Sequence, residues 1–154
     1  EEEVLAPMIA RGLACVGALD HEWLFPRCHA VCHHGGCGTA HCGMRHACPT
    51  IVVAFFGDQP LWGSLLQQKG CGRLILARNA SRETFQEAVH FVLSNEAMYA
   101  AQELQRTLKE EIRRGGGLPW AVESFHRQLP LELISCDVCR HSAALASYND
   151  IPQR

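Results

Sequence analysis

The chain has 154 residues, of which 47% are hydrophobic and 19% are charged, and its formal net charge is −2. This length is enough for one domain with its own core, and the composition excludes a disordered tail, a collagen-like repeat and a coiled coil. Of the 14 lysines and arginines only Lys69 and Lys109 are lysines, and the arginines are scattered. We therefore expect no broad nucleic-acid-binding face.

The start of the sequence and its cysteines indicate whether the chain is part of a longer protein and which cellular compartment it suits. No apolar run reaches the ~18 residues that a membrane span needs, and no signal peptide opens the chain. The chain begins with Glu1-Glu2-Glu3 rather than Met, which favours a piece of a longer protein over a processed one. Its nine cysteines are an odd number, which is atypical of a secreted disulfide framework. We therefore expect a reducing compartment in which most thiols are free and buried.

The first half of the chain alternates between short apolar runs and helical patterns. The predicted strands are residues 13–16, 29–33, 51–54 and 73–76, and the predicted helices are a short one around 22–25, one from about 39 to 47, and one ending near Gly70. The β-branched run at 51–54 is typical of a strand covered on both faces. Repeated strand–helix units predict an α/β fold with a Rossmann-like parallel sheet and flanking helices. A complete doubly wound domain has more strands than these four, so we expect the early strands to be missing.

The second half of the sequence is predicted to be helical. The expected helices are residues 82–93, for which Ser81 is a suitable N-cap, 95–114 and 120–129. We interpret residues 1–130 as one domain and residues 131–154, which have no clear pattern, as a tail of unclear structure.

The clearest local motif is the glycine-rich segment His34-Gly35-Gly36-Cys37-Gly38-Thr39, between a predicted strand and a predicted helix. Glycines let the backbone approach a ligand closely, and a helix N-terminus offers unpaired N–H groups and partial positive charge. This geometry binds phosphate, and His34 can donate a hydrogen bond to the same anion. The motif is neither GxGxxG nor GxxxxGK[ST], so from the residues alone a phosphate or diphosphate site and an ordinary tight turn stay equally open.

A second polar segment, Asp58-Gln59, follows the next predicted strand and is expected at the same edge of the sheet. A carboxylate beside a carboxamide suits the hydroxyl groups of a sugar. Taken alone, these two residues favour the simpler interpretation that one of them caps the following helix.

Several segments together resemble a known family. They are His21-Glu22-Trp23-Leu24-Phe25-Pro26-Arg27, His33-His34-Gly35-Gly36-Cys37-Gly38-Thr39, Gly43-Met44-Arg45, Pro49-Thr50, and Phe55-Phe56-Gly57-Asp58-Gln59-Pro60-Leu61-Trp62-Gly63. Their order and spacing resemble the donor-binding half of nucleotide-sugar glycosyltransferases, most closely the sterol 3β-glucosyltransferase group, and also bacterial antibiotic glycosyltransferases. The resemblance implies a GT-B fold, of which this chain would be most of the carboxyl-terminal domain.

The resemblance also implies a reaction, which is inverting transfer of glucose from UDP-glucose to a sterol or related lipid hydroxyl, with no cofactor and no metal. It places the donor diphosphate against residues 34–39, the donor sugar near Asp58 and Gln59, and the nucleobase near Trp23, which could equally anchor its own short helix. The catalytic base is expected in the missing amino-terminal domain, so no catalytic residue is predicted here. We expect the isolated chain to be inactive, and the full-length protein to be cytoplasmic with any membrane contact peripheral.

Several positions depart from the family pattern. The family usually has a small residue in place of Cys37, Thr-Thr-Ala-Ala in place of residues 39–42, Arg-Ala-Gly in place of residues 45–47, and a proline in place of Ala54. His41 and His46 are expected to crowd the first turn of their helix. Two alternatives therefore stay open. The chain could be a truncated or degenerate module that binds no donor, or binds a partner instead, and the full enzyme could act on a different small-molecule acceptor.

A zinc site is a further alternative. The spacings that suggest one are Cys28-x3-Cys32-His33-His34, Cys37-x4-Cys42 and Cys136-x2-Cys139-x-His141. Structural zinc usually needs two close pairs, and only Cys136 and Cys139 have that spacing. Free buried cysteines are the commoner explanation, so we predict no metal.

Overall fold

The computed structural model describes residues 2–128, with side chains from Leu5 onward. The chain separates into two units at Glu110 and Glu111, and each is described by itself. The elements are α1 (Glu2–Ala10), α2 (His21–Leu24), the 3-10 turn η1 (Phe25–Arg27), β1 (Val31–His33), α3 (Cys37–Arg45), β2 (Thr50–Ala54), α4 (Gln59–Gln68), β3 (Gly72–Leu76), the 3-10 turn η2 (Ala77–Asn79), α5 (Arg82–Val92), α6 (Asn95–Arg113) and α7 (Gly117–Gln128).

The three strands form one parallel sheet in the order β1-β2-β3. Thr50 at the start of β2 pairs with Val31 on one side and with Gly72 on the other. Because α3 connects β1 to β2 and α4 connects β2 to β3, the carboxyl ends of all three strands meet at one edge of the sheet. The predicted Rossmann-like parallel sheet with flanking helices is confirmed.

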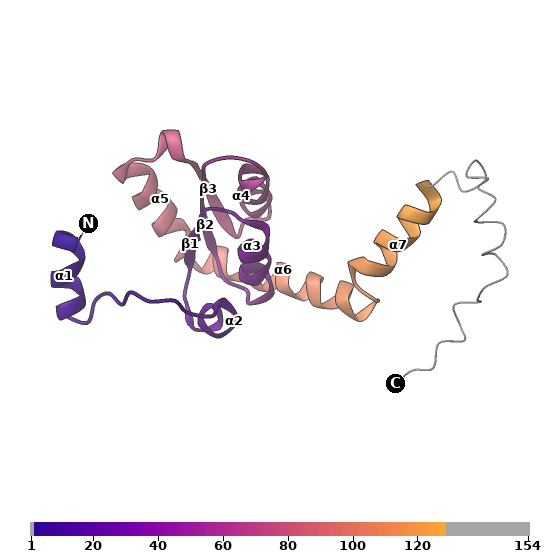
Figure 1. Cartoon of the computed structure of the whole chain (residues 1–154), viewed down its shortest axis with the longest axis horizontal. Coiled ribbons are helices and arrows are strands. Elements are labelled where there is room, and N and C mark those ends of the chain that lie inside the picture. The colour runs from indigo at the N-terminus through magenta and orange to yellow at the C-terminus, as the bar shows by residue number, and fades with distance from the viewer. Residues whose placement is uncertain (1, 129–154) are drawn as a thin grey trace, which may run out of the picture. The chain divides into compact units, whose positions relative to one another are not determined.

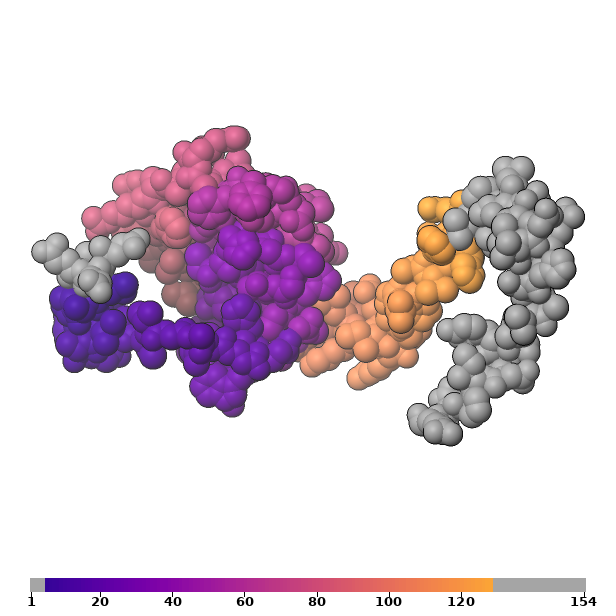
Figure 2. All heavy atoms as spheres, in the orientation of Figure 1, coloured from indigo at the N-terminus to yellow at the C-terminus, as the bar shows by residue number. Residues whose placement is uncertain are grey.

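Helices cover both faces of this sheet (Figure 1). Val52 of β2 belongs to a buried cluster with Met44 of α3, Leu66 of α4 and Ala101 of α6. The next residue back, Ile51, points to the other face and packs with residues of β3 and α5, namely Ile75, Ala88 and Val92. In the space-filling view the purple to magenta part of the chain, which includes α3 and α4, forms a continuous surface (Figure 2). The β-branched run of β2 is therefore buried on both faces, as predicted.

The close packing of α4 on the sheet depends on a glycine. A Cβ atom at Gly63 would lie 2.6 Å from Leu74 Cδ1 and 3.1 Å from Val52 Cβ. No larger side chain fits there without moving the helix away from β2 and β3. Gly63 thus sets the distance at which α4 crosses the sheet.

One predicted strand is wrong. Residues 13–16 lie in an irregular segment, where Leu13 is 60% and Val16 is 71% exposed. A four-residue apolar run can form a strand only beside a neighbour with which it pairs, and the described residues provide three strands, none of which pairs with it. The segment follows α1, a helix that the sequence analysis did not predict.

The helical boundaries differ by a few residues. Ser81 caps α5 through a capping box with Thr84, as its sequence position suggests. Helix α7 begins at Gly117, three residues before the predicted start. The predicted tail at 131–154 lies outside the described residues, so the proposed division at residue 130 stays a prediction. Among the described helices, none is long and apolar enough to cross a membrane.

Candidate functional site

A cavity of about 410 Å³ lies where β1 ends and α3 begins. Its walls come from α2, the turn η1, strand β1 and the start of α3, and the lining residues are His21, Leu24, Phe25, Val31, Cys32, His33, His34 and Thr39. This is the carboxyl edge of the sheet, where open α/β folds bind their ligands. Two residues of the predicted diphosphate site, His34 and Thr39, line it directly.

Gly35 fixes the glycine loop on the sheet. Its φ is +93°, in the left-handed region, and a Cβ there would lie 2.7 Å from Val52 Cγ1 and 3.0 Å from the carbonyl oxygen of Gln59. The loop therefore lies directly on β2 and on the first residue of α4. The expectation that the two polar segments meet at one sheet edge is correct.

The N-terminus of α3 offers unpaired backbone donors. Gly36 is the N-cap and has no side chain that could accept from the first turn. The first helical bond joins the N–H of Ala40 to the oxygen of Gly36, so the N–H groups of Cys37, Gly38 and Thr39 have no acceptor in the helix. The first turn also contains no acidic residue. The helix dipole and these N–H groups together favour an anion.

His34 lies over the same turn. Its Nε2 is 2.6 Å from the place where a Cβ of Gly36 would be, so the ring occupies the space that a side chain at position 36 would need. His34 is exposed and lines the cavity. It can therefore donate to an anion held by the start of α3.

His33 is a site residue that sequence reasoning missed. Its Nδ1 accepts the N–H of Gly35 at 3.0 Å, which leaves the ring proton on Nε2. That Nε2 is buried and has no hydrogen-bond partner among the described residues. Burial, together with the neighbouring His34 and His21, lowers the pKa of His33 to about 4, so the ring is neutral near pH 7. The two adjacent histidines before the glycines were the available signal.

Asp58 and Gln59 support their own loop. Gln59 is 7% exposed, and its Oε1 accepts the N–H of Phe55 at 2.8 Å and that of Phe56 at 3.2 Å. Asp58 stands at the N-cap of α4 but does not cap it with its side chain, and its Oδ2 accepts the indole N–H of Trp62 at 2.9 Å. The simple helix-cap interpretation does not describe either side chain. The predicted contacts with a donor sugar stay a prediction.

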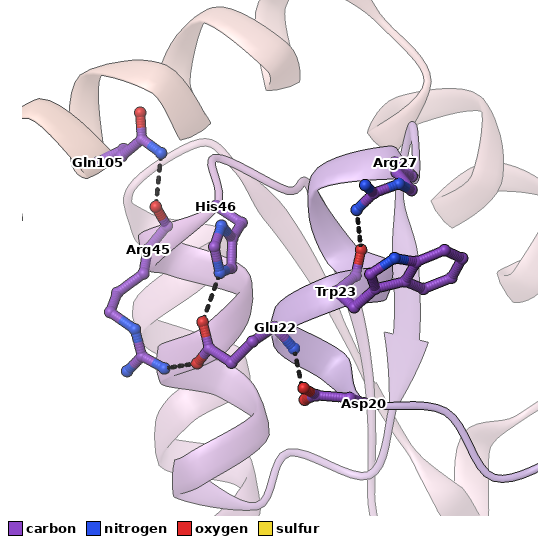
Figure 3. Close-up of polar contacts among 7 residues, drawn as sticks. All are labelled: Asp20, Glu22, Trp23, Arg27, Arg45, His46 and Gln105. Carbon is purple, nitrogen blue, oxygen red and sulfur yellow. Dashed lines mark hydrogen bonds and ion pairs between the residues drawn. The ribbon is translucent and has the colours of Figure 1, made fainter.

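Trp23 lies beside the cavity rather than in its lining. Trp23 is 53% exposed, and the guanidinium of Arg27 lies 4.5 Å from the centroid of its ring (Figure 3). Arg27 also donates to the carbonyl oxygen of Trp23. Its neighbours His21 and Leu24 supply the cavity wall from α2. The nucleobase contact at Trp23 stays a prediction.

A polar cluster joins α2 to the C-terminal end of α3 (Figure 3). One carboxylate oxygen of Glu22 pairs with Arg45, and the other lies 2.7 Å from Nε2 of His46. His46 and Arg45 lower the pKa of Glu22 to about 2. The carbonyl oxygen of Arg45 accepts from the side chain of Gln105 in α6. The cluster holds the cavity wall formed by α2 against α3.

The expected crowding by His41 and His46 is wrong. His46 is the C-cap of α3, at the other end from the glycine loop. His41 lies in the second turn of α3, where its ring packs edge-on against Trp62 with the centroids 4.9 Å apart. Neither ring occupies the first turn, so neither obstructs the unpaired N–H groups.

The family follows from a match that covers most of the chain. Residues 5–113 match the sequence model of a protein family, the erythromycin biosynthesis protein CIII-like C-terminal domain. The chain belongs to this family. A sterol 3-beta-glucosyltransferase of Arabidopsis thaliana is 40% identical over 130 residues, which are 84% of this chain and 20% of that protein. A sterol 3-beta-glucosyltransferase of Cryptococcus neoformans is 34% identical over 114 residues, which are 74% of this chain and 7% of that protein.

Solved structures give the same fold. A kitacinnamycin glycotransferase matches with a TM-score of 0.57 and 24% identity. The match covers 73% of this chain and 28% of that protein. The glycosyltransferase VinC, solved in complex with DTDP, has a TM-score of 0.54 with 18% identity over 66% of this chain and 27% of its own. The chain thus has the fold of part of these glycosyltransferases, and it spans about a fifth of the Arabidopsis relative.

Proposed function

We propose that this chain binds the nucleotide-sugar donor of a glycosyltransferase. Joined to its acceptor domain, it would transfer glucose from UDP-glucose to a sterol or related lipid hydroxyl with inversion. The single observation that supports this most is the cavity of about 410 Å³ at the unpaired N-terminus of α3, with His34 and Thr39 in its wall. The sterol acceptor rests on the names of the two relatives described above, both of which are sterol 3-beta-glucosyltransferases.

The proposed chemistry uses the donor end of the cavity. When the glycosidic bond to the diphosphate breaks, negative charge grows on the departing oxygen. The N–H groups of Cys37, Gly38 and Thr39, the helix dipole and His34 would stabilise that charge in a fixed geometry. A general base must take the proton of the acceptor hydroxyl, and we place this base in the amino-terminal half. We therefore expect the isolated chain to bind donor without transferring glucose.

Gln59 and Asp58 have limited capacity left for the sugar. Oε1 of Gln59 is occupied by two loop amides, and Oδ2 of Asp58 by Trp62. The remaining groups are the Nε2 of Gln59, which can donate, and the Oδ1 of Asp58, which can accept. One donor and one acceptor suit adjacent hydroxyls of glucose.

The experiment is a calorimetric titration of the 154-residue chain with UDP and with UDP-glucose. We expect saturable binding of both, and we expect His34→Ala to weaken both about tenfold or more, because it removes one hydrogen bond to a charged group. Asp58→Asn should weaken UDP-glucose by a few-fold and leave UDP unchanged. His41→Ala is the matched control, since it removes a histidine of α3 that does not line the cavity.

Other outcomes separate the alternatives. A folded chain that binds neither ligand would favour the degenerate module. Equal binding of UDP and dTDP would leave the nucleobase unassigned while keeping the diphosphate site. Glucosylation of a sterol by this chain alone would contradict the placement of the base elsewhere. We place the full-length enzyme in the cytoplasm, with membrane contact, where it occurs, supplied by segments outside this chain.

A further inference from the structure

Metal-ligating side chains gather around the second half of α3, away from the glycine loop. They are Glu22 of α2, Cys42 of α3 and His46 at the C-cap of α3. One ligand atom of each residue, a carboxylate oxygen, Sγ and an imidazole nitrogen, lies within 4.8 Å of the other two. Cys42 and His46 are four residues apart, so they share one face of the helix. The proposed donor site uses none of the three side chains.

We propose that Glu22, Cys42 and His46 bind a divalent transition-metal ion, with zinc as the ion that fits best. A thiolate, an imidazole and a carboxylate are the ligand types that zinc takes in proteins, whereas magnesium and calcium prefer oxygen alone. Zinc bond lengths in a tetrahedral site put ligand atoms about 3.4–3.6 Å apart. The ligand atoms lie within 4.8 Å of one another, and the contact of 2.7 Å between Glu22 and His46 must open, so side-chain shifts of about 1 Å are needed to reach that geometry.

The surroundings of the cluster leave one side open. Cys42 is 3% exposed, whereas the side chain of Glu22 is 53% exposed and that of His46 is 24% exposed. The buried sulfur would form the floor of the site, and the two other ligands would face solvent. An ion can therefore enter from solvent and keep a water molecule as its fourth ligand.

The ion competes with the proton of the Cys42 thiol and with two contacts of Glu22, one to His46 and one to Arg45. Arg45 pairs with Glu22, so the carboxylate must turn one oxygen from the guanidinium to the metal. Burial and the Glu22 carboxylate raise the pKa of the Cys42 thiol, so the thiol is protonated before the ion binds. Binding would break the S–H bond, form the S–metal bond and release that proton to the buffer, and the His46 nitrogen that binds the ion would first give up the proton it donates to Glu22.

The position of the site gives it a structural consequence. Helix α2 supplies Glu22 to the ion and His21 and Leu24 to the wall of the cavity. Helix α3 supplies two ligands and, at its other end, the unpaired N–H groups. A bound ion would fix these two walls against each other. The inference does not depend on which nucleotide sugar the cavity takes.

The test uses the full chain with Cys136→Ser and Cys139→Ser, which removes the competing cysteine pair near the C-terminus. Zinc is titrated by calorimetry, and cobalt(II) by absorption. We expect one ion per chain with release of a proton, and a cobalt complex with a sulfur-to-metal charge-transfer band and the d–d bands of a tetrahedral ion. Cys42→Ser should abolish the charge-transfer band. His46→Ala should raise the Kd for zinc at least tenfold.

Matched controls separate ligation from folding. His41→Ala removes a histidine of the same helix, and Cys71→Ala removes a cysteine that is 1% exposed, so both should keep the parent affinity. Metal-free melting curves show which variants are folded, and zinc affinities are compared only among folded variants. The proposal is overturned if the cobalt complex has no thiolate band, if His46→Ala binds zinc as tightly as the parent, or if His41→Ala loses binding to the same extent.

Discussion

The loops that follow β1 and β2 at the carboxyl edge of the sheet differ in how their backbone N–H groups are satisfied. After β1, the chain turns through Gly35 and Gly36, and the N–H groups at the start of α3 have no side-chain acceptor. After β2, the carboxamide of Gln59 accepts the N–H groups of both Phe55 and Phe56. One loop leaves its backbone donors for a ligand, and the other uses a buried side chain to satisfy its own.

The contrast explains why the two loops have different composition. The first loop is pressed against Val52 and the backbone of Gln59, so it needs a residue without a Cβ at position 35. The second loop exposes the side chains of Phe55 and Phe56, at 65% and 74%, and is stabilised by its polar residues instead. Polar side chains in the second loop therefore stabilise structure first, and any sugar contact uses what remains.

The largest expected effect comes from Gly35→Ala, which adds a Cβ where the first loop packs against β2 and α4. The new Cβ would clash with Val52 and with the Gln59 oxygen at a left-handed φ of +93°. Left-handed strain and overpacking together should cost about 2–4 kcal/mol of unfolding free energy. Urea unfolding measures this loss, and calorimetry should show that UDP binding is lost as well.

Gly38→Ala is the control for that comparison. A Cβ at Gly38 meets nothing within 4 Å, and the residue lies inside α3. The substitution should therefore be neutral or stabilising by about 0.5–1 kcal/mol, as usual for Gly→Ala within a helix. Equal destabilisation by the two substitutions would mean that the close approach at position 35 is not what constrains the loop.

An intermediate effect is expected from Gln59→Leu, which attacks the second loop. Two backbone N–H groups would lose their acceptor at a buried position, at a cost of about 2 kcal/mol. Because the Gln59 atoms nearest to position 35 belong to its backbone, which the substitution keeps, UDP affinity should fall much less than in Gly35→Ala. Urea unfolding and UDP calorimetry of the same variant measure both quantities.

Gln59→Glu keeps an oxygen acceptor at the same place and should be milder than Gln59→Leu. If the two variants are equally unstable, burial of the side chain and not its pair of hydrogen bonds stabilises the loop. If Gln59→Leu abolishes UDP binding as completely as Gly35→Ala, the two loops form one unit and the contrast between them fails.

Patterns within one element predicted this fold well. The run at 51–54 and the capping residue Ser81 each specify their element locally, and both predictions are confirmed. The strand predicted at 13–16 failed because pairing partners decide whether a short apolar run becomes a strand. Local patterns carry no information about such partners, which lie far away in the sequence.

In the candidate site, too, features set by neighbouring residues were predicted, and contacts between distant residues were not. The glycine loop was predicted because φ above zero and an uncapped helix start depend on nearby residues. The sequence did not predict the hydrogen bond from the N–H of Gly35 to His33. It also did not predict the contacts of Glu22 with Arg45 and His46. Those between α2 and α3 span more than twenty residues, and only the three-dimensional structure brings them together.

The smallest expected effect is a pH dependence of the unfolding free energy that arises from His33, which accepts the N–H of Gly35 in the first loop. The folded-state pKa of His33 is about 4, against an ordinary value of 6.5. Between pH 6.5 and 4 the unfolded chain binds a proton at this residue that the folded chain does not, so stability should fall as the pH falls through this interval. After allowance for the partial exposure of the ring, we expect a loss of about 1 kcal/mol from this residue. Urea unfolding at several pH values measures it, and His33→Gln should have a flatter curve.

Glu22→Gln separates this effect from the polar cluster at the other end of α3. The pKa of Glu22 is lowered to about 2 from an ordinary 4.5, so its contribution is present above pH 4.5 and is lost as the pH falls toward 2. Glu22→Gln should therefore leave the slope between pH 6.5 and 5 unchanged, whereas His33→Gln should reduce it. If His33→Gln and the parent chain have the same slope there, the ring is not held neutral under the loop. The bond from Gly35 would then contribute less to the loop than the packing of its backbone on Val52.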